Sequence, residues 1–295
     1  MSTSAPSKIV ARPFLKWAGG KSKLIPQYER FFPKEFKTYY EPFLGGGAVF
    51  FHLVQHRPPF EAILTDINPE LINAYCCVRD RVDDLIELLE EHQVQHGKYQ
   101  QKYYYQMRAA SGKTEIEKAA RLIYLNKTCF NGLYRENSKG EFNVPMGRYK
   151  NPKICQAELL RSVSLALQPA KIEVRKFEAV LDSAKSSQDF VYFDPPYYPI
   201  SATSDFTAYS REDFKESEQL KLRNIFAELA HRGVKVMLSN SYCDFIHEIY
   251  NHPQSFKNES LPNLQKISAL RAINSDIKGR KRINEYLITS YPVFP

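Results

Sequence analysis

One short apolar run constrains the fold of this 295-residue chain more than any other stretch. The run Asp189–Phe193 is aromatic and β-branched, and Asp194-Pro195-Pro196-Tyr197 follows it directly. Such a run, bounded by prolines, is typical of a buried strand that ends in a rigid turn. Open α/β sheets bind their ligands at the carboxyl ends of their strands. We therefore expect an α/β fold with a ligand site at this turn.

The chemistry of the turn is that of a hydrogen-bond acceptor. Pro195 and Pro196 lack backbone N–H groups, so the Asp194 carboxylate and the carbonyls of Asp194 and Pro195 dominate the turn. A ligand amino group, with two N–H donors, suits such a site. Tyr197 adds a flat face on which a planar ring could stack. Taken alone, the same residues also fit a proline turn with an aspartate cap, so the other motifs have to decide.

A glycine-containing segment near the amino end is a second candidate site. Phe14–Lys21 contains Gly19 and Gly20, which let backbone N–H groups approach a ligand, and Lys21 adds a positive charge. The segment could hold a carboxylate or a phosphate, although it lacks the spacing of a P-loop. A plain turn before a helix over residues 24–32 is the alternative.

Residues 38–66 match the first half of a Rossmann-like unit. A predicted strand over 38–44 is followed by Gly45-Gly46-Gly47 and by a helix from Ala48. A second predicted strand, 62–66, ends in Asp66. It lies about twenty residues after the glycines, the offset at which an acid binds ribose hydroxyls. We favour this interpretation over a simple turn aspartate. Asn68-Pro69 then predicts a helix start.

The middle of the chain predicts helices followed by a hairpin. Residues 71–95 have helical periodicity, residues 98–108 are polar with four tyrosines, and Thr114 with Glu117 forms a capping box before another helix. Residues 126–150 are too rich in Gly, Asn and Pro for a helix and predict a hairpin that turns near 138–140. Its cations and aromatic residues alternate, which suits nucleic-acid bases, although a solvated hairpin would look similar.

The second half of the chain predicts three more strands besides the one before Asp194. They cover 171–174, 234–239 and 283–289. A loop over 199–209 is expected to cover the site, a helix capped by Ser210 is expected to run to Leu229, and 278–282 is a basic loop.

The composition indicates which kind of partner and which cellular compartment to expect. Lys and Arg number 41 against 33 Asp and Glu, a net charge of +8, and there are 19 Tyr and 19 Phe. This favours a polyanionic partner with bases on which to stack. Five cysteines without metal-ligand spacing, no signal peptide and no membrane span predict reduced thiols in the cytoplasm. The pairs His52/His56 and His92/His96 lack a third ligand, so we expect no metal.

The motifs together carry a resemblance. F-L-K-W-A-G-G-K, E-P-F-L-G-G-G, L-T-D-I-N, F-N-G-L-Y-R, E-F-N-V-P-M-G-R-Y-K and D-P-P-Y occur in this order between Pro13 and Tyr291. The chain thus resembles the Dam-type (D12 class, alpha group) DNA adenine-N6 methyltransferases, including the modification enzymes of GATC restriction systems. The resemblance implies a Rossmann-like sheet that uses S-adenosylmethionine. The catalytic domain would comprise 13–75 and 165–295, and a mainly helical target-recognition domain would comprise 76–164.

The resemblance also implies the site residues. The catalytic turn would be Asp194, Pro195, Pro196 and Tyr197. The S-adenosylmethionine site would be formed by Trp17, Ala18, Gly19, Gly20, Lys21, Glu41, Pro42, Phe43, Gly45, Gly46, Gly47, Asp66, Ile67 and Asp194. Trp17 and Lys21 would lie against the cofactor's methionine and adenine portions, and Asp66 would bind its ribose.

Double-stranded DNA is the substrate that the resemblance implies. The matching DNA contacts are Lys16, Phe130, Asn131, Leu133, Arg135, Asn137, Asn143, Pro145, Arg148 and Lys150. Lys16, Leu133, Arg135 and Pro145 match the family's readers of GATC. Phe130 stands where close relatives often carry Tyr, so stacking is kept and one polar contact is lost.

The expected reaction is methyl transfer to an adenine flipped out of the duplex. The turn shared by many amino-methylating enzymes leaves two rivals from the sequence, a cytosine-N4 or RNA adenine methyltransferase and a non-catalytic DNA-binding module. We expect a monomer near the nucleoid. The sequence leaves open the oligomeric state and the choice between a solitary enzyme and half of a restriction system.

Overall fold

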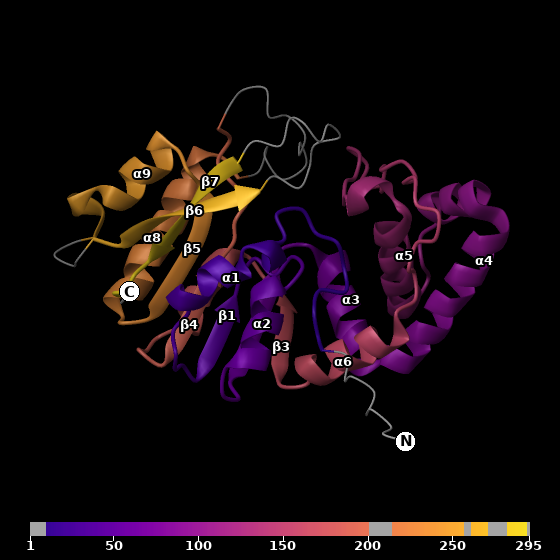
Figure 1. Ribbon diagram of the computed structural model, residues 1–295, viewed down its shortest axis with the longest axis horizontal. Helices are drawn as coiled ribbons and strands as arrows, with labels where there is room; N and C mark the ends of the chain where they lie inside the picture. The colour runs from indigo at the N-terminus through magenta and orange to yellow at the C-terminus, as the bar shows by residue number, and fades with distance from the viewer. Residues whose placement is uncertain (1–9, 201–213, 257–260, 271–281, 294–295) are drawn as a thin grey trace, which may run out of the picture. The chain divides into compact units, whose positions relative to one another are not determined.

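The computed structural model describes residues 10–200, 214–256, 261–270 and 282–293 (Figure 1). Within these described residues, seven strands form one mixed sheet in the order β3-β2-β1-β4-β5-β7-β6. β1 pairs in parallel with β2 and β4, β4 pairs in parallel with β5, and β7 is antiparallel to β5 and β6. The strands are β1 (Thr38–Glu41), β2 (Glu61–Asp66), β3 (Ala170–Val174), β4 (Asp189–Phe193), β5 (Lys235–Ser241), β6 (Asn263–Leu270) and β7 (Arg282–Thr289). The predicted α/β fold is confirmed, and β6 is a strand that the sequence pattern missed.

The helices complete the fold. They are α1 (Ile25–Tyr28), α2 (Ala48–His56), α3 (Pro69–Asp80), α4 (Val82–Ala109), α5 (Glu115–Thr128), α6 (Ala157–Leu167), α8 (Glu216–His231) and α9 (Asp244–Asn251). Short 3-10 turns are η1 (Lys21–Lys23), η2 (Glu29–Phe31), η3 (Phe130–Gly132), η4 (Phe177–Asp182) and η5 (Pro253–Phe256). The chain divides into two compact units. Unit 1 comprises Met1–Ser22, Gly45–His56 and Asn68–Val174, and unit 2 comprises Lys23–Leu44, Arg57–Ile67 and Arg175–Pro295.

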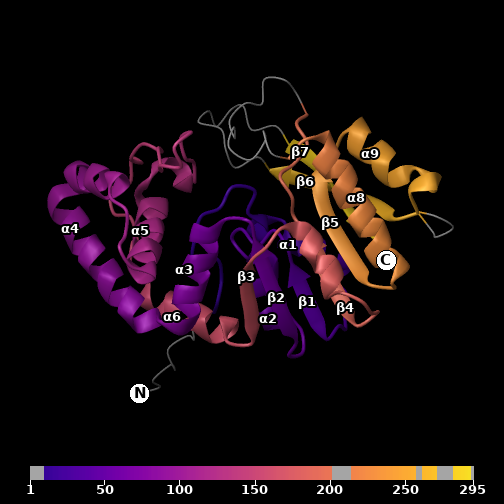
Figure 2. The same cartoon turned by 180° about the vertical axis from the view of Figure 1, so that it is seen from behind.

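Unit 2 is a sheet with side chains packed on both faces. Along β1 and β4 successive residues alternate between the faces, as the period of a strand requires. Tyr40, Val191 and Phe193 belong to the core under η4, α8 and α9, where α8 covers the face seen in Figure 2. Tyr39 and Phe190 point to the other face, where Phe190 packs on Phe32 and Phe36. Burial on both faces explains why β4 is apolar and aromatic from Phe190 to Phe193.

Unit 1 is mainly helical, and its helix starts follow the predicted signals. The Asn68 side chain accepts the Leu71 N–H at 3.0 Å and caps α3. The capping box of α5 is complete, because Thr114 accepts the Glu117 N–H and Glu117 accepts the Thr114 N–H. α5 packs against both α3 and α4, and most of its residues are therefore buried.

The predicted helix 71–95 was wrong in its extent. The helix is interrupted at Arg81, which separates α3 from α4. α4 then continues through the tyrosine-rich segment to Ala109, with a kink at Gln100 (φ 34°, ψ −106°). Tyr104 explains the continuation, since it is fully buried and its hydroxyl donates to the Val144 carbonyl at 2.8 Å. Tertiary packing outweighs a polar local pattern here.

Several expectations fall on chain that the structure does not describe. Ser210, the loop over 201–209 and the basic residues 278–281 lie outside the described residues. The helix expected after Ser210 is present as α8, which begins at Glu216. Gly233 follows its end with φ +77°, the left-handed conformation in which helices commonly end at a glycine.

Candidate active site and recognition hairpin

The acids predicted from the sequence collect at one edge of the unit 2 sheet. Because β1, β2, β4 and β5 are parallel, their carboxyl ends share an edge. Glu41 ends β1 opposite Leu64, Asp66 ends β2, and Asp194 follows β4. Glu41 is buried and accepts the Tyr39 hydroxyl at 2.9 Å. Asp66 is half-buried, and its carbonyl accepts the Arg175 N–H at 3.1 Å.

A short chain of hydroxyl groups orients Asp194. The Ser239 hydroxyl donates to Asp194 Oδ1 at 2.9 Å, and Tyr192 Oη lies 3.0 Å from the same Ser239 oxygen. A serine hydroxyl has one hydrogen, so Tyr192 must donate to Ser239 while Ser239 donates to the carboxylate. Burial first, and then the charge of Asp194, raise the pKa of Tyr192 well above its usual value, so this donor stays protonated.

Two buried amides hold the Pro-Pro turn in place. Asn240 Oδ1 accepts the Tyr198 N–H at 3.2 Å, and its amide nitrogen donates to Gln219, whose own amide donates to the Pro196 carbonyl at 3.0 Å. Asn240 and Gln219 are fully buried. No group among the described residues donates to the Pro195 carbonyl. The turn is thus held on the Pro196 side, and its predicted role as a hydrogen-bond acceptor for a ligand stays a prediction.

A buried carboxylate fixes the ring of Tyr197. Its hydroxyl donates to Glu285 Oε2 at 2.9 Å, and the Tyr28 hydroxyl donates to the other oxygen of Glu285. Glu285 is only 5% exposed, on β7. Burial and the charge of Glu285 hold the pKa of Tyr197 well above its usual range, so it remains a neutral phenol. Its orientation is therefore set by an acid 88 residues away in the sequence.

The predicted cofactor segment of unit 1 packs around Trp17. Gly45 adopts φ +46°, and a Cβ there would lie 2.8 Å from Trp17 Cδ1, so only glycine fits both the conformation and the space. The Tyr75 hydroxyl donates to the Gly45 carbonyl at 3.1 Å. Lys21 is 4% exposed, and its ammonium donates to the Gly19 carbonyl at 2.8 Å. The structure thus brings Trp17, Lys21 and the glycine turn into one unit.

The predicted hairpin is confirmed from Cys129 onward, with sparse backbone pairing, whereas residues 126–128 belong to the last turn of α5. Two isolated bridges join its strands, Cys129 to Met146 and Glu136 to Phe142. The turn at 138–140 is shaped by Asn137, whose side chain accepts the N–H groups of Lys139 and Glu141. This use of Asn137 is structural, and its predicted DNA contact stays a prediction.

The predicted base-reading residues lie around this hairpin. Arg135 is exposed and donates to Asn143 Oδ1 at 2.6 Å, which orients its guanidinium. Asn131 is exposed at φ +55°, in the left-handed region. The other predicted contacts in the hairpin are exposed or half-buried: Phe130 (48% exposed), Leu133, Pro145, Arg148 and Lys150.

Asn126 joins the amino-terminal segment to the hairpin. It is 2% exposed, its Oδ1 accepts the Lys16 N–H at 2.8 Å, and its amide donates to the carbonyls of Lys16 and Gly132. Gly132 is at φ +65°, where a Cβ would lie 2.5 Å from Lys16 Cβ. The Lys16 ammonium in turn lies 4.1 Å from the centre of the Tyr149 ring. Lys16 is therefore fixed beside the hairpin.

The two histidine pairs contact neighbouring aromatic side chains. His92 Nδ1 lies 2.7 Å from the Tyr103 hydroxyl, and His96 Nδ1 lies 2.9 Å from the Tyr124 hydroxyl. Burial lowers the pKa of His92 to about 4. His52 and His56 stack on each other on α2. Among the described residues no group of three or more His, Cys, Asp or Glu side chains is arranged to hold a metal.

Sequence reasoning missed four residues of the Asp194 site: Ser239, Asn240, Gln219 and Glu285. A signal was present for the first two, because the apolar run Val236–Leu238 gives way to Ser239-Asn240-Ser241 within a strand that is buried almost throughout. Gln219 and Glu285 carried no local signal, since each lies in an ordinary helix or strand pattern.

The fold and the turn define a class. An open α/β sheet with Asp-Pro-Pro-Tyr at its carboxyl edge is that of a methyltransferase that acts on an amino group. The profile of the D12 class N6 adenine-specific DNA methyltransferases matches residues 17–270, and the chain belongs to this family.

Named relatives agree with the family match over nearly the whole chain. The chain is 42% identical to the type II methyltransferase M1.LlaDCHI of Lactococcus lactis subsp. cremoris, over 99% of each protein. It is 44% identical to the type II methyltransferase M.MjaIII of Methanocaldococcus jannaschii, over 95% of this chain and 99% of the relative. It is 35% identical to the DNA adenine methylase of Escherichia coli K12, over 95% and 96%. The chain is therefore an adenine-specific DNA methyltransferase, and the two rival functions considered from the sequence are not supported. Its described helices include none with the length and apolar character of a membrane span.

Proposed function

We propose that this enzyme transfers a methyl group from S-adenosylmethionine to adenine N6 within GATC in duplex DNA. One observation carries the proposal: Asp194 is held by Ser239 at the carboxyl edge of the sheet, and the carbonyl of Pro195, the next residue, receives no hydrogen bond from the described residues. Two acceptors side by side match the two N–H bonds of an adenine amino group.

The residues of each unit fit part of the cofactor. In unit 2, Asp66 offers a carboxylate for ribose hydroxyls, and Glu41, Pro42, Phe43 and Ile67 lie beside the same strand ends. In unit 1, Trp17 offers an aromatic ring, and Lys21 offers a positive charge for a carboxylate. The glycines let the backbone approach the cofactor closely. When bound, S-adenosylmethionine supplies an electrophilic methyl group on its sulfonium.

The protein's task is to make adenine N6 a nucleophile. Its lone pair is delocalised into the ring, so hydrogen bonds from N6 to Asp194 and Pro195 favour a tetrahedral nitrogen and stabilise its developing positive charge. The target base must leave the duplex to reach these acceptors. Tyr197, fixed by Glu285, would stack on the flipped ring, and such stacking contributes about 1–3 kcal/mol.

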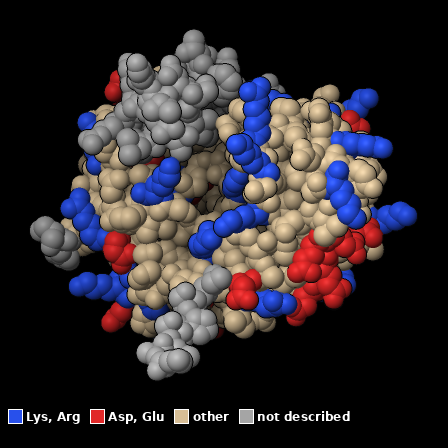
Figure 3. Space-filling view, turned by 45° about the vertical axis from the view of Figure 1, so that its right-hand side comes forward, with Lys and Arg blue, Asp and Glu red and all other residues tan. Residues whose placement is uncertain are grey.

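A basic surface supports duplex binding in unit 1. Burial, with Lys16 and Arg12 nearby, lowers the pKa of Lys127 to about 8, and no acidic side chain among the described residues pairs with it. A phosphate would relieve this repulsion between like charges. In Figure 3, Lys and Arg side chains are spread over the visible face, and the largest group of Asp and Glu side chains lies at its lower right.

The base readers are proposed from the motif match. Arg135 is oriented by Asn143, as a guanidinium must be to make two hydrogen bonds to guanine. Lys16 would contact a second base edge, and Leu133 and Pro145 would contact a thymine methyl. Phe130 and Asn131, exposed at the base of the hairpin, would act on the duplex beside the flipped base.

The experiment compares methylation of matched duplexes that contain GATC or GTTC, with tritiated S-adenosylmethionine. We expect incorporation only into GATC. Asp194→Ala should abolish incorporation, whereas Arg135→Ala should cost about 1–3 kcal/mol of discrimination at the guanine. Equal methylation of both duplexes would refute GATC specificity, and full activity of Asp194→Ala would refute the mechanism.

A further inference from the structure

Tyr134 sits where the hairpin meets the proposed cofactor segment within unit 1. Its ring stacks on Trp17, with centroids 5.6 Å apart and planes at 27°. On the hairpin side, the same ring packs edge-on against Phe142, which lies on the opposite strand, with centroids 6.0 Å apart. Arg135, the proposed guanine reader, is the next residue in the sequence. One ring thus touches both the cofactor segment and the reading strand.

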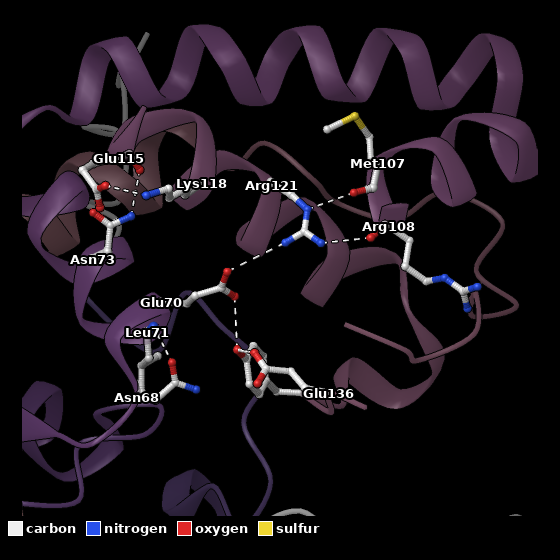
Figure 4. A network of polar contacts seen from close by, with 11 residues as sticks. Asn68, Glu70, Leu71, Asn73, Met107, Arg108, Glu115, Lys118, Arg121 and Glu136 are labelled. Atoms are coloured by element: carbon white, nitrogen blue, oxygen red, sulfur yellow. Dashed lines mark hydrogen bonds and ion pairs between the residues drawn. The ribbon is translucent and has the colours of Figure 1, made fainter. Parts of the chain in front are cut away.

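The hydroxyl of Tyr134 reaches the half-buried carboxylates of Glu70 and Glu136, both of which are labelled in Figure 4. It lies 3.1 Å from Glu70 Oε2 and within hydrogen-bonding distance of Glu136 Oε1. Glu70 stands in the first turn of α3, and Glu136 stands in the hairpin. Burial and these carboxylates raise the pKa of Tyr134 well above its usual range. The phenol therefore stays protonated, and its single hydrogen lies between a carboxylate at the start of α3 and one in the hairpin.

Arg121 anchors the far side of this network. Its guanidinium lies 3.9 Å from Glu70 Oε1, and it also donates to the carbonyls of Met107 and Arg108 near the end of α4. Arg121 is 8% exposed. Because buried charged groups are costly to leave without partners, this arrangement resists partial displacement. A movement of Tyr134 would thus require the whole network to rearrange.

We propose that Tyr134 is a positioning residue that couples cofactor binding at Trp17 to the orientation of the base-reading strand at Arg135. A ligand against Trp17 favours one position of the stacked Tyr134 ring. Because the Tyr134 hydroxyl is hydrogen-bonded to Glu136, that ring position also favours one position of the hairpin. By linkage, cognate DNA must tighten cofactor binding by the same factor. This inference rests on the proposed cofactor and target sites.

Trp17 is the single tryptophan of the chain, so its fluorescence reports directly on this contact. The test is a titration of Trp17 fluorescence with sinefungin, an unreactive analogue of the cofactor, with and without a saturating GATC duplex. The ratio of the two dissociation constants is the coupling factor. We expect a factor of at least about five for the wild type.

Tyr134→Phe keeps the ring on Trp17 and removes the hydroxyl. We expect the coupling factor to fall below about two, while the affinity for sinefungin alone stays within about two-fold. Glu136→Gln removes the charge of the hairpin's carboxylate without changing its size and should act in the same direction. The matched control is Tyr104→Phe, which removes a buried hydroxyl bonded to the hairpin carbonyl of Val144 and does not belong to the network. It should keep the coupling.

The outcomes separate the two proposals. Undiminished coupling in both Tyr134→Phe and Glu136→Gln overturns the inference, as does a wild-type factor of one. Loss of coupling in Tyr104→Phe as well would show that hairpin stability, and not this network, is responsible. If sinefungin inhibits methylation but leaves Trp17 fluorescence unchanged, the proposed cofactor contact fails first, and the inference fails with it.

Discussion

Replacing Ser239 by alanine tests how Asp194 is held. The change deletes a hydrogen bond of 2.9 Å to the carboxylate and leaves the Tyr192 hydroxyl, 3.0 Å away, without its acceptor. A hydrogen bond to a charged group is worth about 1.5–3 kcal/mol. If the whole of this is lost in the transition state, kcat should fall about 10- to 100-fold. The affinity for cofactor and DNA should change little, because Ser239 is fully buried and touches neither in the proposed mechanism.

The same substitution should lower stability for a different reason. An orphaned buried hydroxyl costs about 1–3 kcal/mol. In the double variant Ser239→Ala/Tyr192→Phe the orphaned group is gone, so we expect most of the stability to return while kcat stays low. Urea denaturation measures the first quantity, and single-turnover methylation of a GATC duplex measures the second.

A matched control keeps this test specific. Ser164 is a buried serine of α6 whose hydroxyl donates to the Arg79 carbonyl at 3.0 Å. Ser164→Ala should cost comparable stability and leave kcat unchanged. A kcat of Ser239→Ala within two-fold of the wild type would refute the reasoning that Ser239 aligns the carboxylate. Recovery of kcat in the double variant would show that the loss came from destabilisation.

Three further outcomes are expected. Glu285→Gln leaves one acceptor oxygen for the two phenols of Tyr28 and Tyr197. Tyr197 should then be less ordered, and kcat should drop about tenfold. An unchanged kcat in stopped-flow assays would contradict this. Asn126→Ala should weaken GATC duplex binding about tenfold because Lys16 loses its backbone anchor, and fluorescence anisotropy that shows no loss would argue against it. His92 has its pKa lowered to about 4 and stays neutral when folded, so stability should fall by up to about 3 kcal/mol as pH drops from about 6.5 towards 4. His92→Phe should flatten that part of the pH profile in urea denaturation, and an equally steep profile would assign the effect elsewhere.

Features with local causes were predictable from the sequence. The buried strand before Asp194 is apolar and aromatic from Phe190 to Phe193, and the prolines that follow it restrict the backbone by themselves. Asn68 and Thr114 each accept an N–H group three residues away, so their capping roles follow from spacing alone. The hairpin turn at Asn137 is of the same kind. In each case the residue and the backbone group that it affects are only a few positions apart in the sequence.

Features with distant causes were not predictable. The extension of α4 through its tyrosines depends on a bond from Tyr104 to a carbonyl 40 residues away. The clamp of Asn126 joins Lys16, 110 residues earlier, to Gly132, and the helical pattern around Asn126 gives no hint of it. Burial of a polar side chain is tolerated only when partners are present. Since those partners come from the fold, the sequence pattern cannot supply them.

The polar end of β5 shows what a conflict in the pattern can reveal. β5 lies inside the sheet, with β4 parallel on one side and β7 antiparallel on the other, so its residues are expected to be apolar. Instead, Val236–Leu238 is followed by Ser239, Asn240 and Ser241, all of which are buried. Three buried polar groups in succession would be destabilising unless each had a partner. Ser239 and Asn240 use theirs to hold the turn at Asp194 and Tyr198. The place where local rules of burial are broken is therefore the place where the fold supports its chemistry, as expected for a functional site.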